Sequence, residues 1–138
     1  MFTIPDISNL LESYKDLENL LEDNQGDPAN LLMAFPLGKA GESEALVRIK
    51  YGELTAFCPW TRFPDQGSIH VTYGPNETLL ELKSFKYYLL SFREEHITQE
   101  HLAQKVYHDL YEVLQPRSLE VTLDYMPRGG LHTVFTVR

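Results

Sequence analysis

The sequence predicts one α+β domain in which helices cover one face of an antiparallel sheet. Two segments, 45–50 and 68–73, alternate between apolar and polar side chains, as half-buried strands do. Two stretches with helical spacing of apolar residues follow, and two more alternating segments close the chain. The order strand, strand, two helices, strand, strand favours helices that pack together on one side of the sheet.

The N-terminal third has a different pattern. Residues 6–23 carry apolar side chains at helical spacing, and residues 24–44 contain the glycines and prolines typical of a connector. We therefore divide the chain into 1–44, an N-terminal helix and connector, and 45–138, the main domain.

The elements of the main domain follow from their boundary signals. The helix over 98–114 begins with the cap-like Thr98 and is stopped by Pro116. The other expected elements are a continuation of the first strand over 54–57, an extended segment over 79–82, a helix over 85–93, and a hairpin of 119–125 with 131–137. A small sheet of this kind has free edges, and association of several copies into a ring or barrel removes them. We therefore expect a homo-oligomer.

Composition limits the partners. The chain has 138 residues and a formal net charge of −8, which argues against binding nucleic acid through its phosphates. No apolar run reaches the ~18 residues of a membrane span. The N-terminus has acidic residues where a signal peptide has basic ones. One cysteine cannot form an internal disulfide, so we expect a reducing compartment, the cytoplasm.

The single cysteine lies in a loop with an acid. Cys58 is followed by Pro59 and then by Asp65, in the run CPWTRFPD. A thiol reacts as its thiolate, and the nearby Arg62 can lower its pKa. Asp65 can pass protons on the other side of a substrate. For an arbitrary protein, however, a lone cysteine is more often a small buried hydrophobic residue.

Basic and acidic residues elsewhere suggest a ligand site. Lys83 and Lys86 share one face at the start of a predicted helix, which suits phosphate groups, although without further context a solvated charged surface is the better explanation. Glu100 lies in the first turn of the long helix and can either support the cap or hold two N–H donors of a guanine-like ring. Arg128 lies in a Pro-Arg-Gly-Gly turn, where it can approach an anion closely.

Taken together, these motifs resemble the QueF family. FCPWTRFPD, the block ELKSFKYYLLSFR, the later Glu100 and the run MPRGG match the family in order and spacing, over roughly residues 45–138. The resemblance implies the tunnelling fold: a four-stranded antiparallel sheet with two helices on one face, whose subunits close a multi-subunit barrel with active sites between them. It also implies reduction of the nitrile of 7-cyano-7-deazaguanine to 7-aminomethyl-7-deazaguanine with NADPH, in queuosine biosynthesis for tRNA.

The resemblance assigns roles by position. Cys58 attacks the nitrile carbon to give a thioimide, and Asp65 delivers protons. The substrate-binding residues implied are Glu81, from a neighbouring subunit, together with Leu82, Gln99 and Glu100. The NADPH-binding residues implied are Lys83, Ser84, Lys86 and Arg128. No metal is implied.

Three positions depart from the family: Gln66-Gly67 follow Asp65 where Phe-Ala is usual, Glu94-Glu95 replace Asn-His, and the third, Gln99, touches the site. Gln99 stands where the family usually has His, and an amide cannot act as a proton donor near neutral pH. A related branch, the QueF-like amidinotransferases, stops at the thioimide and forms an amidine on tRNA. The intact block ELKSFKYY favours the reductase over this branch. A non-catalytic deazapurine-binding protein of the same fold is the third alternative.

Overall fold

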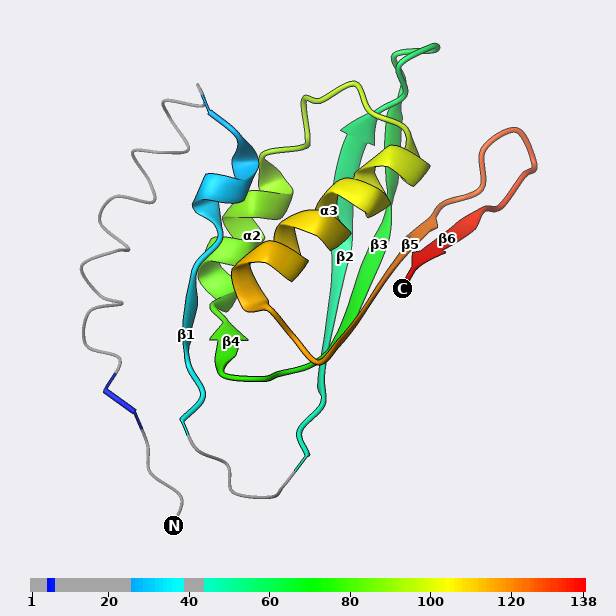
Figure 1. Ribbon diagram of the computed structural model, residues 1–138. Coiled ribbons are helices and arrows are strands. Elements are labelled where there is room, and N and C mark those ends of the chain that lie inside the picture. Colours follow the sequence, from blue (N-terminus) through cyan, green and yellow to red (C-terminus); the bar gives the residue numbers. More distant parts are fainter. Residues whose placement is uncertain (1–4, 7–25, 39–43) are drawn as a thin grey trace.

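The computed structural model describes residues 5–6, 26–38 and 44–138 (Figure 1). The predicted helix over 6–23 lies almost wholly outside these residues. Within the described part of the chain, no helix has the length and apolar character needed to cross a membrane.

The main sheet has four antiparallel strands, as predicted. They are β2 (Val47–Phe57), β3 (Pro64–Gly74), β5 (Ser118–Tyr125) and β6 (Val134–Val137), in the order β2-β3-β5-β6. The first pair is longer than the sequence predicts. β2 continues through an irregularity between Tyr51 and Leu54, and β3 begins four residues early because Pro64 already pairs with Phe57.

Two helices, α2 (Leu82–Leu90) and α3 (Gln99–Leu114), lie over one face of this sheet (Figure 1). The second ends where predicted and begins one residue later, because Thr98 is its cap and its side chain accepts a hydrogen bond from the His101 amide. The first begins three residues before the predicted 85–93. Its cap is Glu81, whose carboxylate accepts hydrogen bonds from the Lys83 and Ser84 amides, and this capping was not apparent from the sequence.

The connector expected over 24–44 contains regular structure. A short 3₁₀ helix, η1 (Pro28–Leu31), is followed by β1 (Ala34–Pro36), which pairs antiparallel with β4 (Thr78–Leu80) in a second, two-stranded sheet. Leu31 and Leu32 are buried in the core. This part of the chain therefore packs on the main domain.

The core lies between the helices and the sheet. Alternate residues of the central strands face the helices and are almost fully buried, among them Ile69, Val71, Tyr73, Val121 and Leu123. Buried apolar side chains of α3, including Leu102, Val106 and Leu110, pack against them. Among the residues that the structure describes, the outer strands β2 and β6 each pair with one neighbour, which leaves an open edge on each.

Candidate active site

Three connections meet at one end of the sheet, the upper end in Figure 1: β2 to β3, α2 to α3, and β5 to β6. The first two are joined through Phe57, whose amide donates to the Glu95 carbonyl and whose carbonyl accepts from the Ile97 amide. A cavity of about 250 Å³ lies between the three connections. Its lining residues are Cys58, Pro59, Trp60, Asp65, Thr98, Gln99, Glu100, Tyr125, Met126, Arg128, Leu131 and Thr133.

Cys58 directly follows β2 and is held by a tight turn. Its amide donates to the Phe63 carbonyl, and its carbonyl accepts from the Arg62 amide, both at 2.9 Å. Arg62 has a positive φ of 61°, an unusual conformation for a residue with a side chain, and it closes the turn. Cys58 is only 2% exposed, so it faces the cavity from a fixed position.

The surroundings of Cys58 favour its thiolate. Hydrogen bonds from Thr61, first from its hydroxyl and then from its amide, lower the pKa of the Cys58 thiol to about 7, against the opposing effect of burial. The Trp60 amide and the Arg128 side chain contribute in the same direction. The sequence-based hypothesis assigned this influence to Arg62. In the structure the guanidinium that acts on the thiol is that of Arg128.

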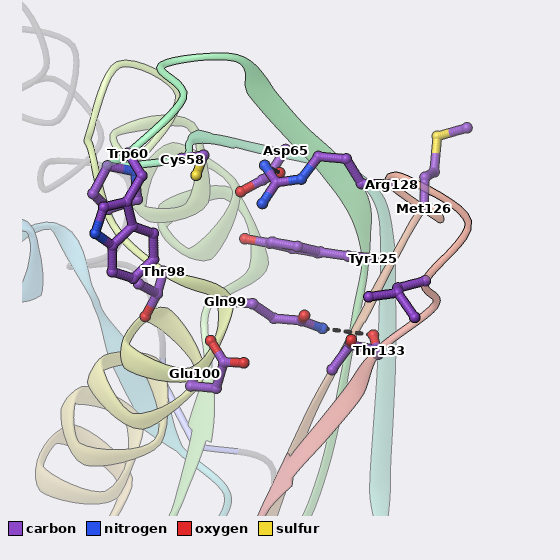
Figure 2. A pocket seen from close by; sticks show the side chains of 12 residues that line it. Cys58, Trp60, Asp65, Thr98, Gln99, Glu100, Tyr125, Met126, Arg128 and Thr133 are labelled. Atoms are coloured by element: carbon purple, nitrogen blue, oxygen red, sulfur yellow. Dashed lines mark hydrogen bonds and ion pairs between the residues drawn. The ribbon is translucent and has the colours of Figure 1, made fainter.

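Asp65, near the start of β3, pairs with Arg128 from the β5–β6 connection (Figure 2). The Arg128 Nη1 and Asp65 Oδ1 atoms are 2.5 Å apart, and the Asp65 side chain is 11% exposed. Burial raises the pKa of the Asp65 carboxyl, the Arg128 charge opposes this, and the nearby Glu100 charge adds to it. Asp65 therefore keeps a proton to a higher pH than an ordinary aspartate does.

The first two residues of α3 have different environments. The Gln99 side-chain Nε2 donates to the Leu123 carbonyl at 2.9 Å and to the Thr133 carbonyl at 2.8 Å, the second of which is drawn in Figure 2. Gln99 thus ties the helix to β5 and to the segment before β6. Glu100 is exposed and lines the cavity. Its position suits recognition of a ligand with adjacent N–H donors.

The predicted cofactor block lies elsewhere. Glu81, Leu82 and Lys83 are at the start of α2, beside β4, at the opposite end of the fold from Cys58 (Figure 1). They line a separate surface depression together with residues of the β2 edge such as Val47. A single chain therefore brings together Cys58, Asp65, Gln99, Glu100 and Arg128, but keeps Glu81, Leu82, Lys83, Ser84 and Lys86 apart from them.

Within the cofactor block, Ser84 is fully buried. Its hydroxyl donates to the Glu81 carbonyl and accepts from the Met33 amide, so in one chain it supports the helix start and does not reach a ligand. Lys83 and Lys86 are exposed, and the Lys83 ammonium lies 5.8 Å from the centre of the Tyr87 ring. The two lysines therefore remain the side chains that can meet a phosphate here.

Two cavity residues were not singled out from the sequence. Trp60 is 81% exposed at the cavity mouth and offers a planar apolar surface. Tyr125 ends the alternation of Leu119, Val121 and Leu123 in β5, a pattern that indicates a core position and says nothing of its hydroxyl. Among the described residues, that hydroxyl is the buried side-chain polar atom left without a hydrogen-bond partner.

The fold and the site define a class: small α+β proteins in which a free thiol of lowered pKa and a carboxyl group of raised pKa line one cavity. The match to a family model, described as QueF-like protein, covers residues 64–138. The chain belongs to this family.

Relatives and a solved structure agree with the family. An NADPH-dependent 7-cyano-7-deazaguanine reductase of Aquifex aeolicus is 40% identical over 97 residues, which are 70% of this chain and 75% of the relative. A protein of the same name from Prochlorococcus marinus is 37% identical over 129 residues, 93% of this chain and 91% of the relative. The apo crystal structure of the archaeosine synthase QueF-Like matches with a TM-score of 0.64 and 25% identity, over 70% of this chain and 94% of that one.

Proposed function

We propose that this protein is an NADPH-dependent oxidoreductase that reduces the nitrile of 7-cyano-7-deazaguanine to an aminomethyl group. The observation that carries the proposal is the cavity in which a thiol of lowered pKa, Cys58, faces a carboxyl of raised pKa, Asp65. The similar proteins of Aquifex aeolicus and Prochlorococcus marinus are named for this reaction. A free catalytic thiol suits a reducing compartment, so we place the reaction in the cytoplasm.

The chain's own residues account for the first step. The Cys58 thiolate attacks the nitrile carbon, and the electron pair of one C–N π bond moves to nitrogen. The Asp65 carboxyl gives that nitrogen a proton, and the proton released by the thiol restores Asp65. The product is a thioimide in which the carbon accepts hydride far more readily than a nitrile does. Arg128 holds Asp65 in place, and Glu100 binds the N–H groups of the base, with Gln99 positioning the helix that carries it.

NADPH supplies the two hydrides of the reaction. The residues proposed to hold it are Lys83 and Lys86, whose exposed charges in the first part of α2 fit phosphate groups. The Glu81 carboxylate already caps the Lys83 and Ser84 amides, so the lysine charges, and not the helix amides, carry this part of the proposal. The resemblance also implies a role for Arg128 in NADPH binding. In one chain its side chain is paired with Asp65, so the proposed contribution to cofactor binding comes from the Pro-Arg-Gly-Gly turn that carries it.

The site is completed by a second copy of the chain. The open edges of β2 and β6 are accompanied by exposed apolar side chains, Leu46 and Leu82 near the first and Leu131 and Val134 near the second. Pairing β2 of one copy with β6 of the next buries these side chains and extends the sheet into a ring. It also brings Glu81 and Leu82 of one copy toward the cavity of another. Sedimentation should give a mass of several subunits at micromolar concentration, and a monomer would contradict this arrangement.

Intact mass spectrometry tests the chemistry. Without NADPH, saturating 7-cyano-7-deazaguanine should raise the protein mass by one substrate, and Cys58→Ala should show no increase. With NADPH, the adduct should disappear as NADPH is oxidised. An unmodified wild-type protein would refute the proposal. An adduct that NADPH does not consume but ammonia does would instead support the amidine-forming activity of the archaeosine synthase branch, and reversible binding alone would support a non-catalytic binding protein.

A further inference from the structure

The hydroxyl of Tyr125 occupies an unusual position. Tyr125 is 7% exposed, and its oxygen is fully buried, yet within the described part of the chain no group donates to it or accepts from it. Buried polar atoms in folded proteins nearly always have a partner, and an exception calls for a reason. Figure 2 shows the ring crossing the middle of the cavity with its oxygen directed inward, between the Asp65–Arg128 pair and Gln99.

The backbone around Tyr125 is fixed. Tyr125 lies opposite Gly67 in the β3–β5 ladder, where a Cβ on Gly67 would come within 2.2 Å of the Asp124 carbonyl oxygen and 2.7 Å of the Tyr125 Cα. Only glycine allows the strands to approach so closely at this point. The next residue is bound to the same strand, since the Met126 amide donates to the Gln66 carbonyl at 2.8 Å. The hydroxyl is therefore presented to the cavity by a rigid support.

The charges around the hydroxyl keep its proton in place. Burial raises the pKa of Tyr125, and the negative charges of Asp65 and Glu100 raise it further. At neutral pH the side chain is a neutral hydrogen-bond donor. Other donors near it are already engaged: the Gln99 Nε2 binds two main-chain carbonyls, and Arg128 binds Asp65.

We propose that the Tyr125 hydroxyl donates a hydrogen bond to the nitrile nitrogen of the substrate and stabilises the negative charge that develops there while Cys58 adds to the carbon. This inference rests on the proposed function and adds a catalytic residue to it. The balance of the step is unchanged. The S–C bond forms, the π electron pair moves to nitrogen, and Asp65 still supplies the proton. A donor placed in advance where charge develops lowers the barrier without any rearrangement during the reaction.

The test compares two tyrosine-to-phenylalanine variants. Tyr125→Phe removes only the unpartnered hydroxyl. Tyr73→Phe removes a buried hydroxyl that accepts a hydrogen bond from the Leu80 amide at 3.0 Å, away from the cavity, and is the matched control. Thioimide formation is followed without NADPH, so that hydride transfer does not enter. Affinity is measured for 7-deazaguanine, which has the ring but no nitrile, and thermal unfolding reports on the fold.

Tyr125→Phe should form the adduct on the order of 100-fold more slowly, the effect of losing one such donor. Its affinity for 7-deazaguanine and its unfolding temperature should match the wild type. Tyr73→Phe should show the reverse, a lower unfolding temperature with an unchanged adduct rate. An adduct rate in Tyr125→Phe equal to the wild type would overturn the inference, as would a loss of 7-deazaguanine affinity as large as the loss of rate. Absence of the adduct in the wild type would refute the proposed function itself.

Discussion

The ionisation of Cys58 depends on the hydroxyl of Thr61, and Thr61→Val tests this dependence. Valine keeps the shape of threonine and removes the oxygen whose hydrogen bond has the largest effect on the Cys58 pKa. The same oxygen accepts from the Phe63 amide at 3.3 Å, which orients it in the turn. Thr61→Ser retains the hydroxyl and is the matched control.

The expected magnitude follows from the pKa of Cys58. The wild-type pKa of about 7, lowered from 9.0, means that the thiolate predominates above pH 7 and is lost as the pH falls through that value. If the Thr61 hydroxyl accounts for about half of the shift, the thiolate fraction of the variant at pH 7 is about fivefold lower. The intrinsic nucleophilicity of a thiolate rises with its pKa, by about threefold per unit. The variant should therefore react about twofold more slowly at pH 7 and about threefold faster above pH 9.

The assay is the rate of reaction of Cys58 with a small disulfide reagent from pH 5 to 10, which is unambiguous because the chain has no other thiol. The midpoint of the profile should be near 7 for the wild type and Thr61→Ser, and about one unit higher for Thr61→Val. Superimposable profiles for all three proteins would show that the Thr61 hydroxyl does not control the thiol.

Three further predictions concern the proposed reaction. Asp65→Asn should leave Cys58 reactive toward the disulfide reagent but slow thioimide formation by about 10²-fold or more, because the amide cannot supply a proton; equal rates would contradict this role. Replacing Lys83 and Lys86 together with Ala should weaken NADPH binding by about 1.5–3 kcal/mol per lysine while preserving the adduct, as titration calorimetry can measure. Gln99→His should speed NADPH oxidation without changing the adduct rate. It should also lower the unfolding free energy by about 1 kcal/mol, because one hydrogen bond to a main-chain carbonyl is lost. A wild-type turnover already as fast as adduct formation would refute the kinetic prediction.

The main sheet and both helices could be predicted because their signals are local. The alternation over 68–73 and the cap at Thr98 need no knowledge of the rest of the chain. The small sheet could not be predicted, because β1 and β4 are three residues long and pair across more than forty residues of sequence. The early start of α2 was hidden because a glutamate at a helix cap is less distinctive than the threonine before α3.

The candidate site was predicted in composition but not in arrangement. Cys58 and Asp65 are close in sequence, so their presence in one cavity could be predicted from one loop. Arg128 is distant in sequence, and only the folded structure shows that it contacts the pair. The Tyr125 hydroxyl was missed for a different reason: alternation identifies the buried face of a strand, but it cannot show that one atom on that face lacks a partner.

The separation of Cys58 from the start of α2 has a consequence for mixed populations of the protein. In the proposed ring, the nucleophile of each site and its lysines belong to different copies, so a copy that lacks only one of them impairs one site and leaves intact the other site to which it contributes. Two inactive variants, Cys58→Ala and Lys83→Ala with Lys86→Ala, should therefore regain activity when they are unfolded and reassembled together. In the mixed rings, a site that has Cys58 from one copy and both lysines from its neighbour is functional. In the proposed ring, the catalytic unit is thus the contact between neighbours, and each chain gives its thiol to one site and its lysines to another.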